Sequence, residues 1–417
     1  MRRAADVVFW SVLSAAFIGP GTITTAATAG ATHGTALLWA LVFSTFACVV
    51  LQEGAARLTA TSGRTLGAAI RERYGRIPAI AVVAAVVLGC AAYEAGNILG
   101  GVAGLQLVLP VPTPLATLGL GILAAALLAT ATTQGVARVL GAIVAIMGLL
   151  FVATAIRVAP PAGAVLRGAL VPAVGPETLG LILGLIGTTV VPYNLFLGSG
   201  LARGRDPTTL WSPIAISVGL GGLISMAVLV VGTAIEGSMD FARLAAVLDE
   251  RWGAGSVVGI GLLAAGASSA ITAPWAAAFA VESATRSRLS GRRRAMVWGG
   301  VLALGVAFGL ANVKPIPMIL LAQMLNGFLL PLVATFLLLA LNSPALLGAG
   351  VNGRAANAAG FAVWSASMVL GTSGVLRAVA SALDRSGPDP GQILRVAATL
   401  TVLAAIPLLR ALRRQRG

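Results

Sequence analysis

The sequence predicts an all-α integral membrane protein with about 12 transmembrane helices, and three observations carry this prediction. Of its 417 residues, 58% are hydrophobic and only 10% are charged, whereas soluble domains have roughly 25% charged residues. Apolar runs of about 18 residues or more recur along the chain, each long enough to cross a bilayer as a helix. Residues rich in Gly, Pro and Arg separate these runs. We therefore expect a single transmembrane domain over residues 1–417.

The apolar runs give the order of the helices. Two of the runs are interrupted at mid-length by a helix breaker, the first at Gly19-Pro20-Gly21-Thr22 and the sixth at Val191-Pro192-Tyr193-Asn194. Two broken helices at matching positions of two halves are typical of a transporter whose substrate binds near the bilayer midplane. A simple proline kink is the alternative for each break. We expect the helices near residues 7–34, 36–60, 78–108, 113–133, 139–158, 178–201, 211–235, 255–282, 295–311, 316–341, 357–380 and 391–410.

The basic residues predict the orientation of the helices, because cytoplasmic loops of membrane proteins carry an excess of Lys and Arg. With the N-terminus inside, twenty of the 28 Lys and Arg residues fall in inner loops. We therefore expect a plasma-membrane protein with both termini in the cytoplasm. Helices 1–5 and 6–10 then form two repeats of opposite orientation, at about residues 6–158 and 176–342, followed by extra helices at 357–380 and 391–410. The eight outer basic residues are Arg157, Arg167, Arg243, Arg251, Lys314, Arg377, Arg385 and Arg395.

Other classes of function find no support in the residues. The net charge of +15 could suggest a nucleic-acid partner, but the basic residues lie in short loops and form no basic face with interleaved aromatics. Cys48 and Cys90 lie inside apolar runs, and His33 is the only histidine, so neither a disulfide framework nor a zinc site is predicted. No catalytic triad, pair of catalytic carboxylates or Walker loop can be assembled. We expect no enzyme activity, no cofactor and no nucleic-acid partner.

Motifs in the broken helices resemble a known family. Segments 19–25 (GPGTITT) and 187–199 (GTTVVPYNLFLGS) resemble the first and sixth helices of the Nramp family of proton-coupled divalent metal transporters. The resemblance covers helices 1 to 10 and implies a LeuT-type fold, a 5+5 inverted repeat with broken helices 1 and 6. Shorter matches lie at Ala29-Gly30-Ala31, Leu37-Leu38-Trp39, Leu51-Gln52, Ala55-Ala56-Arg57-Leu58, Gly266-Ala267-Ser268-Ser269 and Ala322-Gln323.

The chain departs from the family at the positions that bind the metal. Family members carry D-P-G-N in helix 1, where Asp and Asn are ligands, and here these positions are Gly19 and Thr22. They carry M-P-H-N in helix 6, where Met is a ligand, and here that position is Val191 and the following His is Tyr193. A dehydrated divalent cation needs negative charge and several donor atoms in place of its water. We therefore expect no metal site at the breaks.

The altered break in helix 1 favours a different substrate. Without the Asp, the N–H groups near Gly21 to Thr24 form the positive end of a half-helix, which attracts anions, and the Thr hydroxyls add donors. We predict uptake, coupled to protons, of a small organic anion or another small solute that is not a transition metal. The alternatives are a divalent metal (Mn²⁺, Fe²⁺ or Mg²⁺) transporter, as in the family, and a channel or non-transporting sensor. The expected binding residues are Gly19, Pro20, Gly21, Thr22, Thr25, Thr188, Val191, Tyr193, Asn194, Gln323 and Asn326.

Two carboxyl groups inside predicted helices have different interpretations. Glu94 lies near the middle of the third helix, where a carboxyl group is costly unless it is paired or functional, and we predict that it carries the coupled proton. A structural carboxyl, hydrogen-bonded to its neighbours, is the alternative, and Asn97 lies on the same helix face. Glu53 stands four residues before Arg57, the spacing of an intrahelical ion pair. The expected partners of the chain are the solute, the proton and the lipid bilayer.

Overall fold

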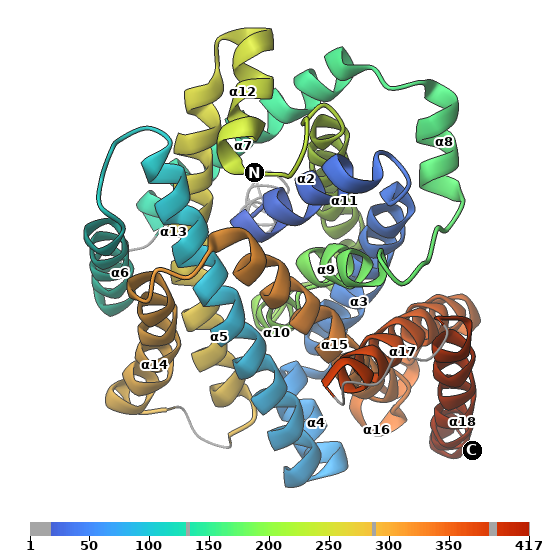
Figure 1. The fold of residues 1–417 in the computed structure, drawn as a ribbon. Helices are drawn as coiled ribbons and strands as arrows, with labels where there is room; N and C mark the ends of the chain where they lie inside the picture. Colours follow the sequence, from blue (N-terminus) through green and yellow to red (C-terminus); the bar gives the residue numbers. More distant parts are fainter. Residues whose placement is uncertain (1–17, 131–133, 286–288, 383–389, 417) are drawn as a thin grey trace.

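The regular secondary structure of the computed structural model is helical throughout the residues that the structure describes, which are 18–130, 134–285, 289–382 and 390–416 (Figure 1). The α-helices range from 4 to 31 residues in length. They are α2 (Pro20–His33), α3 (Leu38–Ser62), α4 (Leu66–Tyr74), α5 (Arg76–Gln106), α6 (Thr113–Thr130), α7 (Gln134–Val158), α8 (Ala162–Leu170), α9 (Leu179–Thr189), α10 (Pro192–Leu201), α11 (Trp211–Gly232), α12 (Phe241–Trp252), α13 (Gly255–Ser283), α14 (Gly291–Leu310), α15 (Pro315–Leu341), α16 (Pro344–Leu347), α17 (Arg354–Ala382) and α18 (Pro390–Arg416), with 3₁₀ turns at Pro207–Thr209 and Gly348–Gly350.

Eleven spans in the described residues are long and apolar enough to cross a membrane, with α9 and α10 counted as one. The predicted first helix at 7–34 is described only from residue 18 onward, as α2. The expected all-α membrane architecture of about 12 helices is thus confirmed. The short helices α4, α8 and α12 were not predicted, because each lies in a connection between apolar runs. The division into repeats at 6–158 and 176–342 stays a prediction.

α2 and α10, the helices that follow the two breaks, both begin at a proline. Pro20 and Pro192 each occupy the first turn of a helix, and the residues before them, Gly19 (φ −97°, ψ 176°) and Val191 (φ −77°, ψ 121°), are extended. The missing N–H of proline is tolerated at that position of a helix, and the residue before proline is pushed away from helical geometry. The sequence therefore ends α9 and restarts the chain as α10 at the predicted place.

The helices around these breaks pack closely. α5 lies along α13, and a Cβ atom placed on Gly266 would lie 2.5 Å from the Cα atom of Gly101, so the two backbones touch. α15 packs against α5, α9 and α2 in the interior, whereas α17 and α18 lie together on one side of the bundle (Figure 1). This arrangement places the breaks of α2 and α9–α10 between α5, α13 and α15.

Candidate functional site

The two breaks meet directly. The hydroxyl oxygens of Thr22, in the first turn of α2, and Thr188, in the last turn of α9, lie 2.9 Å apart and form a buried hydrogen bond. The structure therefore brings two of the predicted site residues into contact across 166 positions of the sequence.

Gln323 of α15 contacts both α2 and α9. A Cβ atom on Gly21 would lie 2.1 Å from Gln323 Nε2, and one on Gly187 would lie 2.0 Å from the backbone oxygen of Gln323. These distances are far shorter than real Cβ contacts, so glycine is required at both positions while Gln323 stays where it is. The buried Oε1 atom of Gln323 has no hydrogen-bond partner. Gln323 thus brings an available amide oxygen to the breaks.

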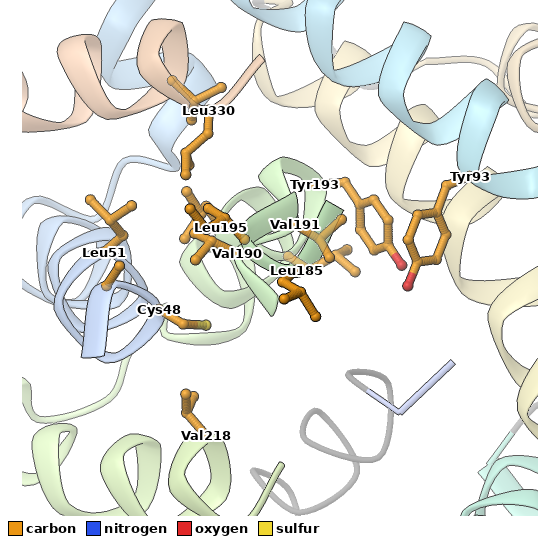
Figure 2. Close-up of a cluster of buried hydrophobic side chains, with 14 of the residues drawn as sticks. Cys48, Leu51, Tyr93, Leu185, Val190, Val191, Tyr193, Leu195, Val218 and Leu330 are labelled. Atoms are coloured by element: carbon orange, nitrogen blue, oxygen red, sulfur yellow. The ribbon is translucent and has the colours of Figure 1, made fainter. Parts of the chain in front are cut away.

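Hydroxyl groups occupy the space in front of Gly19. A Cβ atom there would lie 3.3 Å from both Tyr93 Oη and Ser269 Oγ. The ring of Tyr93, on α5, meets the ring of Tyr193, on α10, edge to face, with centroids 5.6 Å apart and planes at 78°. Figure 2 shows both tyrosines pointing their hydroxyl groups toward the same place. Tyr93 and Ser269 are not among the predicted binding residues, although Ser269 lies within a segment that resembles the family.

Other predicted residues lie around this centre with different surroundings. Pro20 packs against Gly100 of α5, and the methyl group of Thr25 packs against Gly184 of α9. Val191 belongs to the buried hydrophobic cluster beside Tyr193 (Figure 2). These packing contacts explain the burial of Pro20, Thr25 and Val191, and they do not indicate that any of the three binds a ligand.

The two predicted asparagines differ in their contacts. Asn194 is buried, its side-chain amide has no hydrogen-bond partner, and its backbone oxygen accepts a 3.3 Å hydrogen bond from Gln52 Nε2. Asn326 faces Gly89 of α5, where a Cβ atom would lie 2.8 Å from its Oδ1 atom. Asn326 thus contacts α5, and its side-chain amide, like that of Asn194, is buried without a hydrogen-bond partner.

Glu94 lies next to Tyr93 in sequence but faces another neighbour. Its side chain is fully buried, and its Cγ atom would lie 2.7 Å from a Cβ atom on Gly305 of α14. The Asn97 amide donates a 3.3 Å hydrogen bond to Oε2, and Oε1 has no hydrogen-bond partner. Among the residues whose burial the structure describes, Glu94 is the only buried acidic side chain, and no Lys or Arg is buried. Of the Asp, Glu, Lys and Arg side chains whose burial is described, the interior thus contains one acidic and no basic member.

The donor set at the breaks consists of neutral oxygens. In the described part of the chain, no group of three or more His, Cys, Asp or Glu side chains is placed to hold a metal ion. Hydroxyl and amide oxygens from α2, α5, α9, α13 and α15 instead converge near the breaks. Such oxygens suit hard cations rather than soft ones.

Comparisons with known proteins agree with this architecture. The model of the Nramp family, described as "Natural resistance-associated macrophage protein-like", matches residues 11–377. A relative from Mycobacterium tuberculosis strain CDC 1551, named "Divalent metal cation transporter MntH", is 27% identical over 375 residues, which cover 84% of this chain and 86% of that protein.

Solved structures share the fold. A manganese transporter of Eremococcus coleocola superposes with a TM-score of 0.76 at 21% identity, covering 97% of this chain and 94% of its own. Mhp1, a nucleobase-cation-symport-1 family transporter, superposes with a TM-score of 0.59 at 13% identity, covering 98% and 92%. The predicted LeuT-type fold with two broken helices is confirmed.

The predicted organic-anion substrate is wrong. The relatives are named as divalent metal cation transporters, which favours the alternative of a divalent metal substrate over an organic anion. The structure supplies a physical reason, because an anion in the interior would meet a buried carboxyl group and no buried Lys or Arg among the described residues. In addition, the Thr22 hydroxyl bonds to Thr188, and the Gln323 side chain already covers Gly21 at the start of α2.

Proposed function

Because this chain belongs to the Nramp family, we propose that it is a secondary transporter of a divalent metal cation. The single observation that carries the proposal beyond the family is the sign of the charge that the interior can hold. Among the described Asp, Glu, Lys and Arg side chains, only Glu94 is buried. The names of the relatives support the same substrate class. A cation is favoured by such an interior, whereas an anion is disfavoured.

We propose that the cation passes between the two breaks. The hydroxyl groups of Thr22 and Thr188 and the Oε1 atom of Gln323 are the oxygens offered there by α2, α9 and α15. Tyr93 and Tyr193 add hydroxyl groups from α5 and α10. Since these donors are neutral, a hard cation that retains several of its waters suits them better than a fully dehydrated one.

Coupling to protons is assigned in this proposal to Glu94. Its burial, its hydrogen bond from Asn97 and its free Oε1 atom support a group that can be charged or neutral. The carboxylate of Glu94 attracts a cation in the interior and a bound proton removes that attraction, so the protonation of Glu94 and the binding of the cation are linked. The proposal also includes the orientation with both termini in the cytoplasm of a plasma-membrane protein.

Uptake into liposomes tests the substrate class. Purified protein is reconstituted, and the entry of Mn²⁺, Mg²⁺ and Ca²⁺ is followed separately with a trapped metal-sensitive dye. We expect saturable entry of at least one of these cations, lowered about tenfold by Gln323→Leu if the lost oxygen stabilised transport by about 1.4 kcal/mol. Gln106→Leu, at the exposed end of α5, is the matched control and should leave uptake unchanged.

Two results would contradict the proposal. One is the absence of uptake for all three cations by protein that elutes as a folded species. The other is uptake that rises linearly with concentration and shows no acceleration by cation on the opposite side, which would indicate a channel.

A further inference from the structure

A cavity of about 680 Å³ lies away from the breaks, between α3, α11, α15 and α17. Most of its wall is aliphatic or aromatic, and it contains no residue of the candidate site. Val42 and Phe46 of α3, on this wall, are 40% and 50% exposed. Since these helices are membrane spans, the open side of the cavity faces the hydrocarbon region of the bilayer.

One end of the cavity is polar and carries one charge of each sign. Glu53 and Arg57 form the predicted ion pair at 2.8 Å, with about a fifth of each side chain exposed. Arg57 also donates to the backbone oxygen of Gly350 at 3.1 Å and to Asn352 Oδ1 at 2.5 Å. These three bonds use three of the five N–H groups of a guanidinium, so N–H groups remain for a further acceptor.

The polar end lies at the membrane surface. α3 ends at Ser62, α11 begins at Trp211, α15 ends at Leu341 and α17 begins at Arg354, so all four helices reach the surface at the same end. Trp211, which lines the cavity, is 63% exposed, and Trp is enriched at the interface between bilayer and water.

The length of the cavity matches one leaflet of a bilayer. Its wall on α3 runs from Val42 to Arg57, fifteen residue steps, or about 22 Å at the rise of an α-helix. Half of a hydrocarbon core is about 15 Å thick, which leaves room for a headgroup at the polar end. A single lipid of that leaflet therefore fits the wall from headgroup to chain end.

We propose that this cavity binds one phospholipid whose headgroup is zwitterionic and carries a primary amine, as in phosphatidylethanolamine. The phosphate accepts the remaining N–H groups of Arg57, and the ammonium group lies against the carboxylate of Glu53. The acyl chains lie along the apolar wall of α3, α11 and α17. Because Glu53 balances Arg57, a headgroup with net negative charge would meet one repulsive contact. The site is independent of the proposed transport function.

Lipid retention tests this site. Protein purified in detergent is washed, and thermal unfolding is measured with added phosphatidylethanolamine, phosphatidylcholine or phosphatidylglycerol of identical acyl chains. We expect phosphatidylethanolamine to give the largest rise in unfolding temperature and to remain bound at about one molecule per protein. Phosphatidylcholine, whose methylated amine cannot donate to a carboxylate, should give a smaller rise. Glu53→Gln should remove the difference between these two lipids.

Two tryptophan variants locate the effect. Ala359→Trp fills the cavity, whereas Ala358→Trp places the same side chain on the exposed face of α17 outside it. Retention should be lost in the first and kept in the second. Equal stabilisation by the three lipids, preference for phosphatidylglycerol, or equal retention by the two variants would overturn the proposal. If Ala359→Trp does not fold, the lipid series on the unaltered protein decides.

Discussion

Thr22 and Thr188 join two half-helices through one hydrogen bond between small side chains. Each threonine stands at the end of a helix next to a break, where backbone groups lack intrahelical partners. The bond therefore holds the breaks in register without any charged group. Its strength is that of a neutral hydrogen bond, about 1 kcal/mol net.

A double-mutant cycle on this pair should reveal coupling. We expect Thr22→Val and Thr188→Val each to lower the stability of the protein, and the double variant to lose less than the sum, with a coupling energy of about 1 kcal/mol. The cycle is measured by unfolding in detergent. Thr22→Val combined with Thr401→Val, whose hydroxyl bonds within α18, is the control and should be additive. Additive losses in the first pair would contradict the role assigned to the bond.

Glu94→Gln tests the proposed proton carrier. The amide keeps the shape of the side chain and a hydrogen bond to Asn97, but it cannot release a proton. We expect the variant to bind cations more weakly and still to exchange them, while a pH gradient no longer drives their accumulation in liposomes. Glu250→Gln, on the exposed surface, should keep the response to the gradient. Gradient-driven accumulation that survives in Glu94→Gln would show that another group carries the proton.

At the scale of elements, α15 determines how closely the half-helices approach. α9 packs on α15 at Gly187 and Gly327, where a Cβ atom on Gly327 would lie 2.5 Å from the backbone oxygen of Leu183. Such backbone contacts are favourable in membranes because lipid offers no hydrophobic drive for helix association, so close packing has to supply it. The α9–α15 interface is therefore intolerant of added volume.

Gly187→Ala should destabilise the protein by about 1–3 kcal/mol, since its methyl group would collide with the backbone of α15. Gly219→Ala on α11 is the matched control, because a Cβ atom there meets nothing within 4 Å. It should leave stability unchanged or raise it by up to about 1 kcal/mol, as alanine favours the helix. Thermal unfolding compares the two variants, and an equal change in both would contradict the role assigned to close packing at Gly187.

The elements themselves could be predicted, whereas their contacts could not. Proline at 20 and 192 and the lengths of the apolar runs indicate where helices break and end. The partners of Gly19 and Gly21 come from α5, α13 and α15, and no local pattern states which helices are neighbours. Tyr93 and Ser269 were missed as site residues for that reason.

The substrate prediction failed for a related reason. It considered the residues missing from the breaks and the dipole of one half-helix, but the electrostatic sign of an interior depends on every buried group. Only the folded chain shows that Glu94 is buried while the described Lys and Arg residues are not. The Glu53–Arg57 pair, which needs one helix only, was predicted and is confirmed.

At the scale of the whole molecule, the predicted orientation implies that only the connections on the outer side of the membrane can be reached by a reagent outside the cell. Ser238 lies before α12, in a connection predicted to be external, and Arg203 lies after α10, in one predicted to be cytoplasmic, and both are exposed. The native Cys48 and Cys90 are buried and should react slowly. We expect Ser238→Cys to react with a membrane-impermeant maleimide in intact cells, and Arg203→Cys to react only after the cells are opened. The reverse pattern would invert the topology.

The double contact of Gln323 links two helices that meet at the breaks. Its side chain rests on α2 and its carbonyl rests on α9, so neither half-helix can shift along α15 without displacing the same residue. We therefore expect a shift of α2 or of α9 to be felt by the other helix through this one residue, so that the two breaks are mechanically coupled.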